Sequence, residues 1–195
     1  MAALALHRTE VKDPGILKFL FSDKRMSIVF LGLRLWLGYQ WISAAEHKLT
    51  DPKWMQTGEA LKGFWLGALK TDPKPVIAFD WYRQFIQFMV NAQAYTWFAK
   101  VVAVGEALIG IALILGAFTA VAAFFGAFMN WNFIMAGAAS TNGMLLVVAV
   151  VLVAGWKVAG YLGVDGIVLP YLASVPELFR RSQPRRPVYR PSPAE

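Results

Sequence analysis

The chain has 195 residues, of which 57% are hydrophobic, with a mean hydropathy of +0.48 and a formal net charge of +7. Its apolar residues fall in long runs, which excludes an ordinary soluble domain and indicates an integral membrane protein. The chain has no cysteine, which excludes disulfides, iron–sulfur clusters held by its own thiolates and covalently attached haem.

Four apolar segments are each near the ~20 residues that a helix needs to cross ~30 Å of hydrocarbon. They cover residues 26–48, 95–116, 118–136 and 143–163. None of them alternates polar and apolar residues, so membrane strands are excluded. The sequence therefore predicts an all-α fold, an integral membrane four-helix bundle over residues 26–163. Small residues such as Gly38 and Gly110 would let its helices approach closely.

The segments outside the bundle are basic. Residues 1–25 precede the first span and include a short interfacial helix over 14–22, and residues 164–195 form a Pro/Arg-rich tail. Lys and Arg concentrate in these two ends, which predicts that both termini are cytoplasmic. These clusters are topology signals that also favour anionic membrane lipid, so no nucleic-acid partner is expected.

The extracytoplasmic loop over residues 49–94 contains two amphipathic patterns, at 54–70 and 76–94. Their apolar faces consist of Trp54, Leu61, Trp65 and Ala68 in the first, and of Tyr82, Phe85, Ile86 and Met89 in the second. Such patterns predict helices that lie in the membrane surface. Because neither Pro nor Gly interrupts residues 76–100, the second helix is expected to continue almost directly into the second span. The pair is either a well-packed loop or a lid over the outer end of the bundle, where a lipid-soluble ligand would enter.

Three polar residues lie inside the apolar segments and are expected to form a buried polar layer: Arg34, Glu106 and Asn130. Counted at ~1.5 Å per residue from the cytoplasmic ends of their spans, they lie at similar depths of roughly 12–16 Å. An Arg34–Glu106 ion pair completed by Asn130 is the least costly arrangement, since an unpaired charge in hydrocarbon is unfavourable. Such a pair would either lock helix packing or allow Glu106 to relay a proton beside a ligand cavity.

A second polar cluster is expected at the outer end of the bundle. His47 and Lys48 close the first span, while Trp131 and Asn132 lie in the outer half of the third. His and Lys can donate to a quinone carbonyl, and Trp offers a stacking face, so these four residues predict a quinone- or anion-binding pocket. The alternative is that they anchor the helix ends at the interface. The chain has only two histidines, so no metal site and no haem are expected on this chain alone.

The chain resembles the DoxX/DoxD family of four-span membrane proteins. The resemblance covers about residues 30–170 and is carried by LRLWLGYQWISAAEHKL (33–49), GEALIGIALILGAFTAVAA (105–123) and MNWNFIMAGAASTN followed by GWKVAGYLGVDGIVLP. It implies a prokaryotic inner-membrane protein with a quinone-linked role, similar to the DoxD membrane subunit of thiosulfate:quinone oxidoreductase. The catalytic residues are unknown, and electrons would pass through bound quinone or through the cofactor of a partner subunit.

Two further functions stay open at this point. One is a non-catalytic accessory subunit that stabilises a larger respiratory or photosynthetic membrane complex and holds lipid, quinone or pigment. The other is a small transporter that uses Glu106 as a proton-coupled carboxylate. Whether the chain is itself an enzyme depends on the redox partner.

Overall fold

A computed structural model describes residues 14–171, and every regular element in this range is a helix. In chain order the helices are α1 (Gly15–Ser22), a 3-10 turn η1 (Lys24–Met26), α2 (Ser27–Thr50), α3 (Pro52–Met55), α4 (Glu59–Ala68), α5 (Asp80–Asn91), α6 (Tyr95–Leu115), α7 (Thr119–Met135), α8 (Asn142–Ala154) and α9 (Trp156–Ala159). Residues 165–171 are also helical. The predicted all-α fold is confirmed for the described residues. The basic residues at 1–13 and 172–195 lie outside them, whereas Lys18, Lys24 and Arg25 of the N-terminal cluster lie within.

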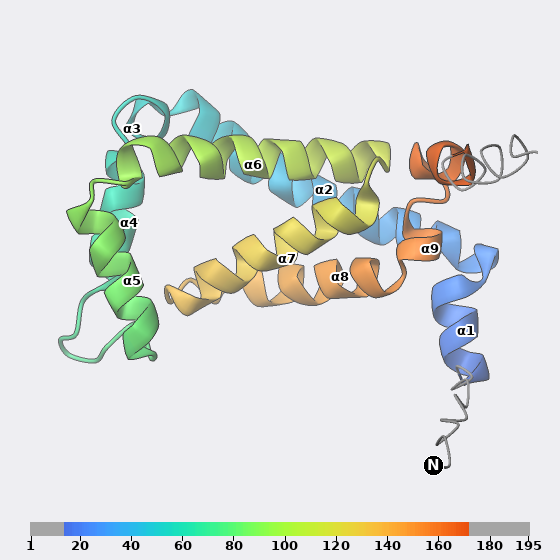
Figure 1. The fold of residues 1–195 in the computed structure, drawn as a ribbon, viewed down its shortest axis with the longest axis horizontal. Coiled ribbons are helices and arrows are strands. Elements are labelled where there is room, and N and C mark those ends of the chain that lie inside the picture. The colour runs from blue at the N-terminus through green and yellow to red at the C-terminus, as the bar shows by residue number, and fades with distance from the viewer. Residues whose placement is uncertain (1–13, 172–195) are drawn as a thin grey trace, which may run out of the picture.

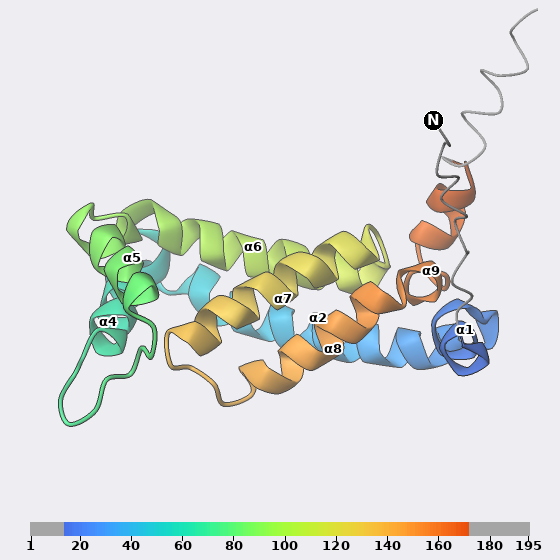
Figure 2. The same ribbon diagram turned by 60° about the horizontal axis from the view of Figure 1, so that its bottom comes forward.

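The four long helices α2, α6, α7 and α8 form the body of the molecule (Figure 1). α2 packs along α6, and α7 packs along α8. α6 and α7 meet at a short turn and diverge away from it in both views (Figures 1 and 2). Two helices, Lys24–Thr50 with its leading 3-10 turn and Tyr95–Leu115, are long and apolar enough to cross a membrane, while α7 and α8 are apolar but shorter.

The close contact between α2 and α6 depends on two glycines. A Cβ on Gly38 would lie 3.1 Å from the carbonyl oxygen of Gly110, and a Cβ on Gly110 would lie 2.7–2.9 Å from atoms of Ile42. Only residues without a side chain allow two helix backbones to approach this closely. This crossing therefore fixes the register of α2 against α6.

The helix expected over residues 143–163 is interrupted, which corrects the sequence prediction. α8 ends at Ala154, and the short α9 follows after Gly155. The ring of Phe30 in α2 packs so tightly on Gly155 that a Cβ there would lie 2.1 Å from it. The break at Gly155 thus accommodates an aromatic side chain from the first long helix.

The two amphipathic segments form α4 and α5, which lie across one end of the bundle (Figure 1). Their buried residues are Leu61, Trp65 and Ala68 in α4 and Tyr82, Ile86 and Met89 in α5. Phe85, which was expected on the apolar face of the second segment, is 44% exposed. The second helix was expected to run almost directly into the second span, and three residues separate α5 from α6 in the structure. α5 ends at Asn91, because Gln93 adopts a left-handed conformation (φ 51°) and the Ala94 amide donates to the Met89 carbonyl, which closes a Schellman-type turn.

Candidate functional site

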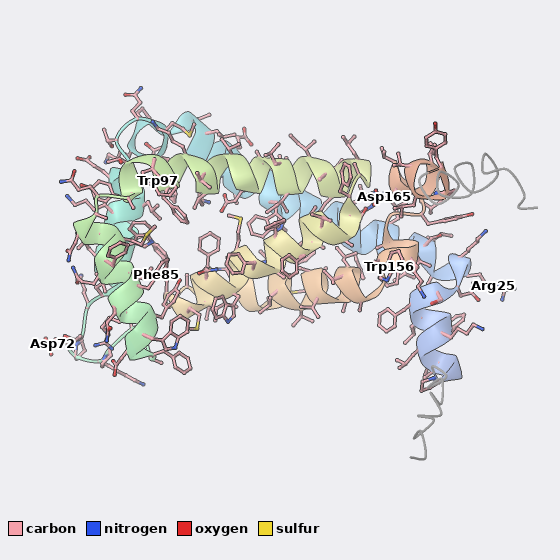
Figure 3. The ribbon with its side chains drawn as sticks, viewed as in Figure 1. Arg25, Asp72, Phe85, Trp97, Trp156 and Asp165 are labelled. Atoms are coloured by element: carbon pink, nitrogen blue, oxygen red, sulfur yellow. The ribbon has the colours of Figure 1, made fainter. Side chains whose placement is uncertain are left out.

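A pocket of about 320 Å³ lies where α4 and α5 cover the diverging ends of α6 and α7. Figure 3 labels Phe85 of α5, one of its aromatic side chains. The lining is almost entirely apolar and comprises Leu61, Trp65, Tyr82, Phe85, Ile86, Met89, Phe98, Val102, Phe128, Met129, Asn132 and Phe133. None of these residues carries a charge at neutral pH. The pocket is therefore suited to a lipid-soluble ligand, as the lid interpretation of the loop requires.

One edge of the pocket is polar. The Tyr82 hydroxyl donates to the backbone carbonyl of Asn132 at 3.0 Å and lies 3.2 Å from its Oδ1 atom. Asn132 Nδ2 donates to the Phe128 carbonyl at 2.8 Å. An amide nitrogen has two hydrogens and a phenol oxygen can also accept, so this edge retains one donor and one acceptor for a ligand.

Burial raises the pKa of the Tyr82 phenol to about 12. The side chain is only 3% exposed, and a phenolate in such surroundings is disfavoured. Tyr82 consequently stays a neutral hydroxyl across the physiological pH range.

An aromatic row borders the pocket on its exposed side. Trp131 of α7 stacks on Trp81 of α5 with ring centroids 6.4 Å apart and on Phe128 at 6.2 Å, and it meets the edge of Tyr82 at 6.3 Å. Tyr82 and Phe128 also line the pocket. The row thus connects an exposed aromatic surface with the pocket interior.

The four residues predicted to bind quinone or an anion do not converge. Asn132 lines the pocket and Trp131 borders it, but His47 is exposed and does not line it. Lys48 instead turns toward the bundle interior, where its Nζ atom lies 2.7 Å from Glu106 Oε2. Sequence reasoning missed Tyr82 as a polar pocket residue, although the predicted apolar stripe of α5 contains it.

The expected Arg34–Glu106 ion pair is not formed, because Glu106 pairs with Lys48. The Glu106 side chain is 1% exposed and the Lys48 side chain is 19% exposed. The Trp54 ring covers the lysine, with its centroid 5.3 Å from Lys48 Nζ. Gly110 meets Ile42 at the helix crossing, so Glu106, one turn earlier in α6, lies beside the end of α2 that carries Lys48. Lys48 follows Arg34 by 14 residues, or ~21 Å along the helix, which puts Arg34 beyond reach.

Arg34 is buried at the other end of α2, between two glycines. A Cβ on Gly116 or on Gly163 would collide with its Nη1 atom, at 1.5 and 2.6 Å respectively. Its Nη2 atom donates to the Leu162 carbonyl at 2.9 Å. The guanidinium therefore joins α2 to the turn between α6 and α7 and to the segment after α9.

Asp165 is a second residue that sequence reasoning missed. Its carboxylate oxygens accept hydrogen bonds from the backbone amides of Phe118 at 2.6 Å and Thr119 at 2.7 Å, at the start of α7. A carboxylate at a helix start satisfies free amides and favours the helix dipole. The glycines around it in GYLGVDG (160–166) were the available signal, since a Cβ on Gly160 would meet the Asp165 side chain.

Asn130 joins neither Arg34 nor Glu106. It is fully buried, and neither atom of its amide has a hydrogen-bond partner among the described residues. The indole nitrogen of Trp41 is also buried without a partner and packs against Gly126, one turn before Asn130. Such groups mark a place where an internal water or a polar ligand atom would bind. The predicted layer is thus buried but divided among different contacts.

No protein-family model, no curated protein and no solved structure matches this chain. The family assignment therefore stays a prediction from the sequence motifs.

Proposed function

We propose that this chain is a multi-pass protein of a prokaryotic inner membrane. Four segments, α2, α6, α7 and the α8–α9 pair, would cross the membrane, and both termini would lie in the cytoplasm. The apolar length of α2 and α6 supports this topology. Large apolar side chains are exposed along the bundle, including Leu108, Phe124, Phe125, Val147 and Val150. A lipid environment would bury these side chains.

We infer further that the pocket binds the ring of a quinone-class lipid, and that the chain is the membrane subunit of a quinone-linked oxidoreductase. The observation that carries this proposal is an apolar pocket with a single polar edge, formed by Tyr82 and Asn132. Its volume of about 320 Å³ is at the lower end of the ~300–1,000 Å³ range typical of ligand pockets. A ring headgroup would fill it, with an isoprenoid tail left in the bilayer.

The free hydrogen of Asn132 Nδ2 would donate to a quinone carbonyl, and the Tyr82 oxygen would accept from a quinol hydroxyl. An anion is disfavoured in this pocket, because its lining is uncharged and Lys48 is engaged by Glu106. Thiosulfate oxidation, which the DoxD resemblance implies, would therefore take place on a partner subunit. Electrons would reach the bound quinone from that partner.

Titration of a short-chain quinone into the purified protein in lipid nanodiscs tests the proposal, with quenching of tryptophan fluorescence as the readout. Asn132→Leu removes the free donor and should weaken binding about fivefold, since a hydrogen bond is worth ~1 kcal/mol and a tenfold change would need ~1.4 kcal/mol. Val102→Phe should weaken it further by filling the pocket floor. Gln84→Leu, an exposed amide on α5 outside the pocket, is the matched control.

Unchanged affinity in both pocket variants would refute a quinone site in this pocket. If quinone does not bind and the chain co-purifies with a larger membrane complex in fixed stoichiometry, the accessory-subunit function is favoured instead. The exposed aromatic row around Trp81 and Trp131 would then be its contact surface.

A further inference from the structure

Two adjoining grooves lie at the end of the bundle opposite the pocket, where Figure 3 labels Arg25, Trp156 and Asp165. The larger, about 280 Å³, is lined by Trp156, Lys157, Tyr161, Asp165, Gly166, Leu169 and Pro170. The smaller, about 120 Å³, is lined by Phe118, Thr119, Ala120, Val121, Trp156, Asp165, Val168 and Leu169. They share Trp156, Asp165 and Leu169, so a single elongated molecule could occupy both.

One lysine lines the larger groove, and a second lies over one of its aromatic rings. Lys157 lines it, with Nζ 5.8 Å from the ring centroid of Trp156, and Lys24 places its Nζ 5.2 Å from the ring centroid of Tyr161. Asp165 is the acidic residue of the lining, but both of its oxygens are bound by backbone amides at the start of α7. Neither Lys24 nor Lys157 forms an ion pair among the described residues, so both ammonium groups are available to an anion.

The smaller groove is apolar and open. Phe118 is 69% exposed and Val121 is 53% exposed, and Leu169 continues the surface into the larger groove. α1 lies beside this end, packs on α9 and exposes Ile16, Leu17 and Phe19 next to Lys18. Such a helix is typical of the membrane–water boundary.

We propose that the two grooves bind one anionic phospholipid of the cytoplasmic leaflet. Its phosphate lies between Lys24 and Lys157, and one acyl chain lies against Phe118, Val121 and Leu169. Charge complementarity selects the headgroup, because basic pockets at the cytoplasmic ends of membrane helices favour anionic lipids. Continuity with an apolar groove selects a lipid over a free phosphate. This inference rests on the membrane topology proposed above and is independent of the quinone pocket.

Native mass spectrometry of the full chain, released from nanodiscs that contain equal amounts of phosphatidylglycerol and phosphatidylcholine, tests the site. Wild type should retain phosphatidylglycerol preferentially. The Lys24→Gln/Lys157→Gln double variant should lose roughly 30-fold of this preference, since each lysine near an anionic surface contributes about fivefold. Val121→Trp should reduce retention of either lipid by filling the apolar groove, and added glycerol phosphate should not displace the bound lipid.

The matched control is Lys62→Gln/Lys74→Gln at the opposite end of the molecule, where Lys62 also lies over an aromatic ring, 5.1 Å from Tyr95. Preference that survives in the Lys24/Lys157 variant, or that falls equally in the control, would overturn the proposal. Displacement by glycerol phosphate would show a phosphate site in place of a lipid site. A chain that does not integrate into membranes would refute the proposed topology, whereas an integrated chain without lipid preference would refute only this site.

Discussion

Lys48 and Glu106 form a buried ion pair, in which each side chain compensates the charge of the other. The carboxylate is almost completely shielded from solvent, and the ammonium, under Trp54, is its partner at 2.7 Å. Removing one member of a buried ion pair leaves an uncompensated charge, which typically costs ~3–5 kcal/mol, whereas replacing both members is often nearly neutral. The effect of these substitutions on stability can therefore be predicted without reference to the function of the protein.

Lys48→Gln should destabilise the folded protein by roughly 3 kcal/mol, while Lys48→Gln combined with Glu106→Gln should recover most of that loss. The stability of the single and the double variant is measured by thermal unfolding in nanodiscs, with circular dichroism as the readout. Lys53→Gln, at an exposed lysine of α3, is the control and should change little. A double variant as unstable as the single one would show that the ion pair is not the source of the loss.

Gly116 lies at a position where the structure has no room for a side chain. It adopts φ 68°, and a Cβ there would overlap the guanidinium of Arg34. Gly116→Ala should therefore cost at least ~2 kcal/mol, of which about 1–2 kcal/mol comes from the left-handed backbone and the rest from displacement of Arg34. The comparison is Gly67→Ala in α4, where nothing lies within 4 Å of the added Cβ.

Gly67→Ala is expected to be neutral or to stabilise by up to about 1 kcal/mol, because alanine is the better helix former. Chemical unfolding of both variants in mild detergent measures the difference. Equal effects at positions 116 and 67 would contradict the packing of Arg34 between Gly116 and Gly163.

At the scale of elements, α5 is held on α7 through Tyr82 and Asn132. The folded-state pKa of Tyr82 is about 12, above the value of ~10 for an unfolded chain. Between these pH values the folded state binds more protons than the unfolded state, so stability falls as pH rises. Below pH ~10 the contribution is fully present.

Wild type should therefore lose on the order of 2 kcal/mol between pH 9 and 12 through this residue, and Tyr82→Phe should lose less over the same range. Urea unfolding at the two pH values, monitored through protection of α5 from proteolysis, compares the two proteins. Tyr39→Phe, which alters an exposed tyrosine on α2, is the control for general alkaline effects. Identical pH slopes in wild type and Tyr82→Phe would contradict the role of Tyr82 in holding α5.

At the scale of the whole molecule, the two ends of the bundle differ in character. One end carries α4, α5 and the turn after α7, and the other carries α1 and α9 (Figure 1). The contacts of Arg34 with Leu162 and of Asp165 with Phe118 also lie at this second end, where Figure 3 labels Asp165. The proposed topology assigns the first end to the outside and the second to the cytoplasm. The chain lacks cysteine, so a single introduced thiol reports its own location.

Thr71→Cys and Ser140→Cys, both exposed at the α4–α5 end, should react with a membrane-impermeant maleimide in intact spheroplasts. Arg25→Cys, exposed at the other end, should react only after the membrane is opened. Mass shift on a gel measures the labelling. The reverse pattern would invert the topology, and labelling of all three in intact spheroplasts would exclude a membrane-spanning chain.

The sequence by itself determined the helical class and the positions of most helices. The expected spans 26–48, 95–116 and 118–136 agree with α2, α6 and α7 within a few residues, because apolar length and helix periodicity are local properties. The amphipathic segment at 76–94 likewise contains α5, whereas the segment at 54–70 is divided between α3 and α4 by a break before Glu59. The sequence also identified Asn132, Glu106 and Lys48 as polar groups of interest, because polar residues are conspicuous in apolar segments.

Only the tertiary structure decided which of these groups meet. Depth counting paired Arg34 with Glu106, yet the Gly38–Gly110 crossing sets a register in which Lys48 reaches Glu106 first. A shift of one helical turn is ~5.4 Å, which is larger than the length of a hydrogen bond, so a small error in register changes every partner. The break at Gly155 and the pocket at Tyr82 likewise depend on side chains from distant helices. Contacts of this kind are absent from any local pattern, because they arise only when separate helices pack together.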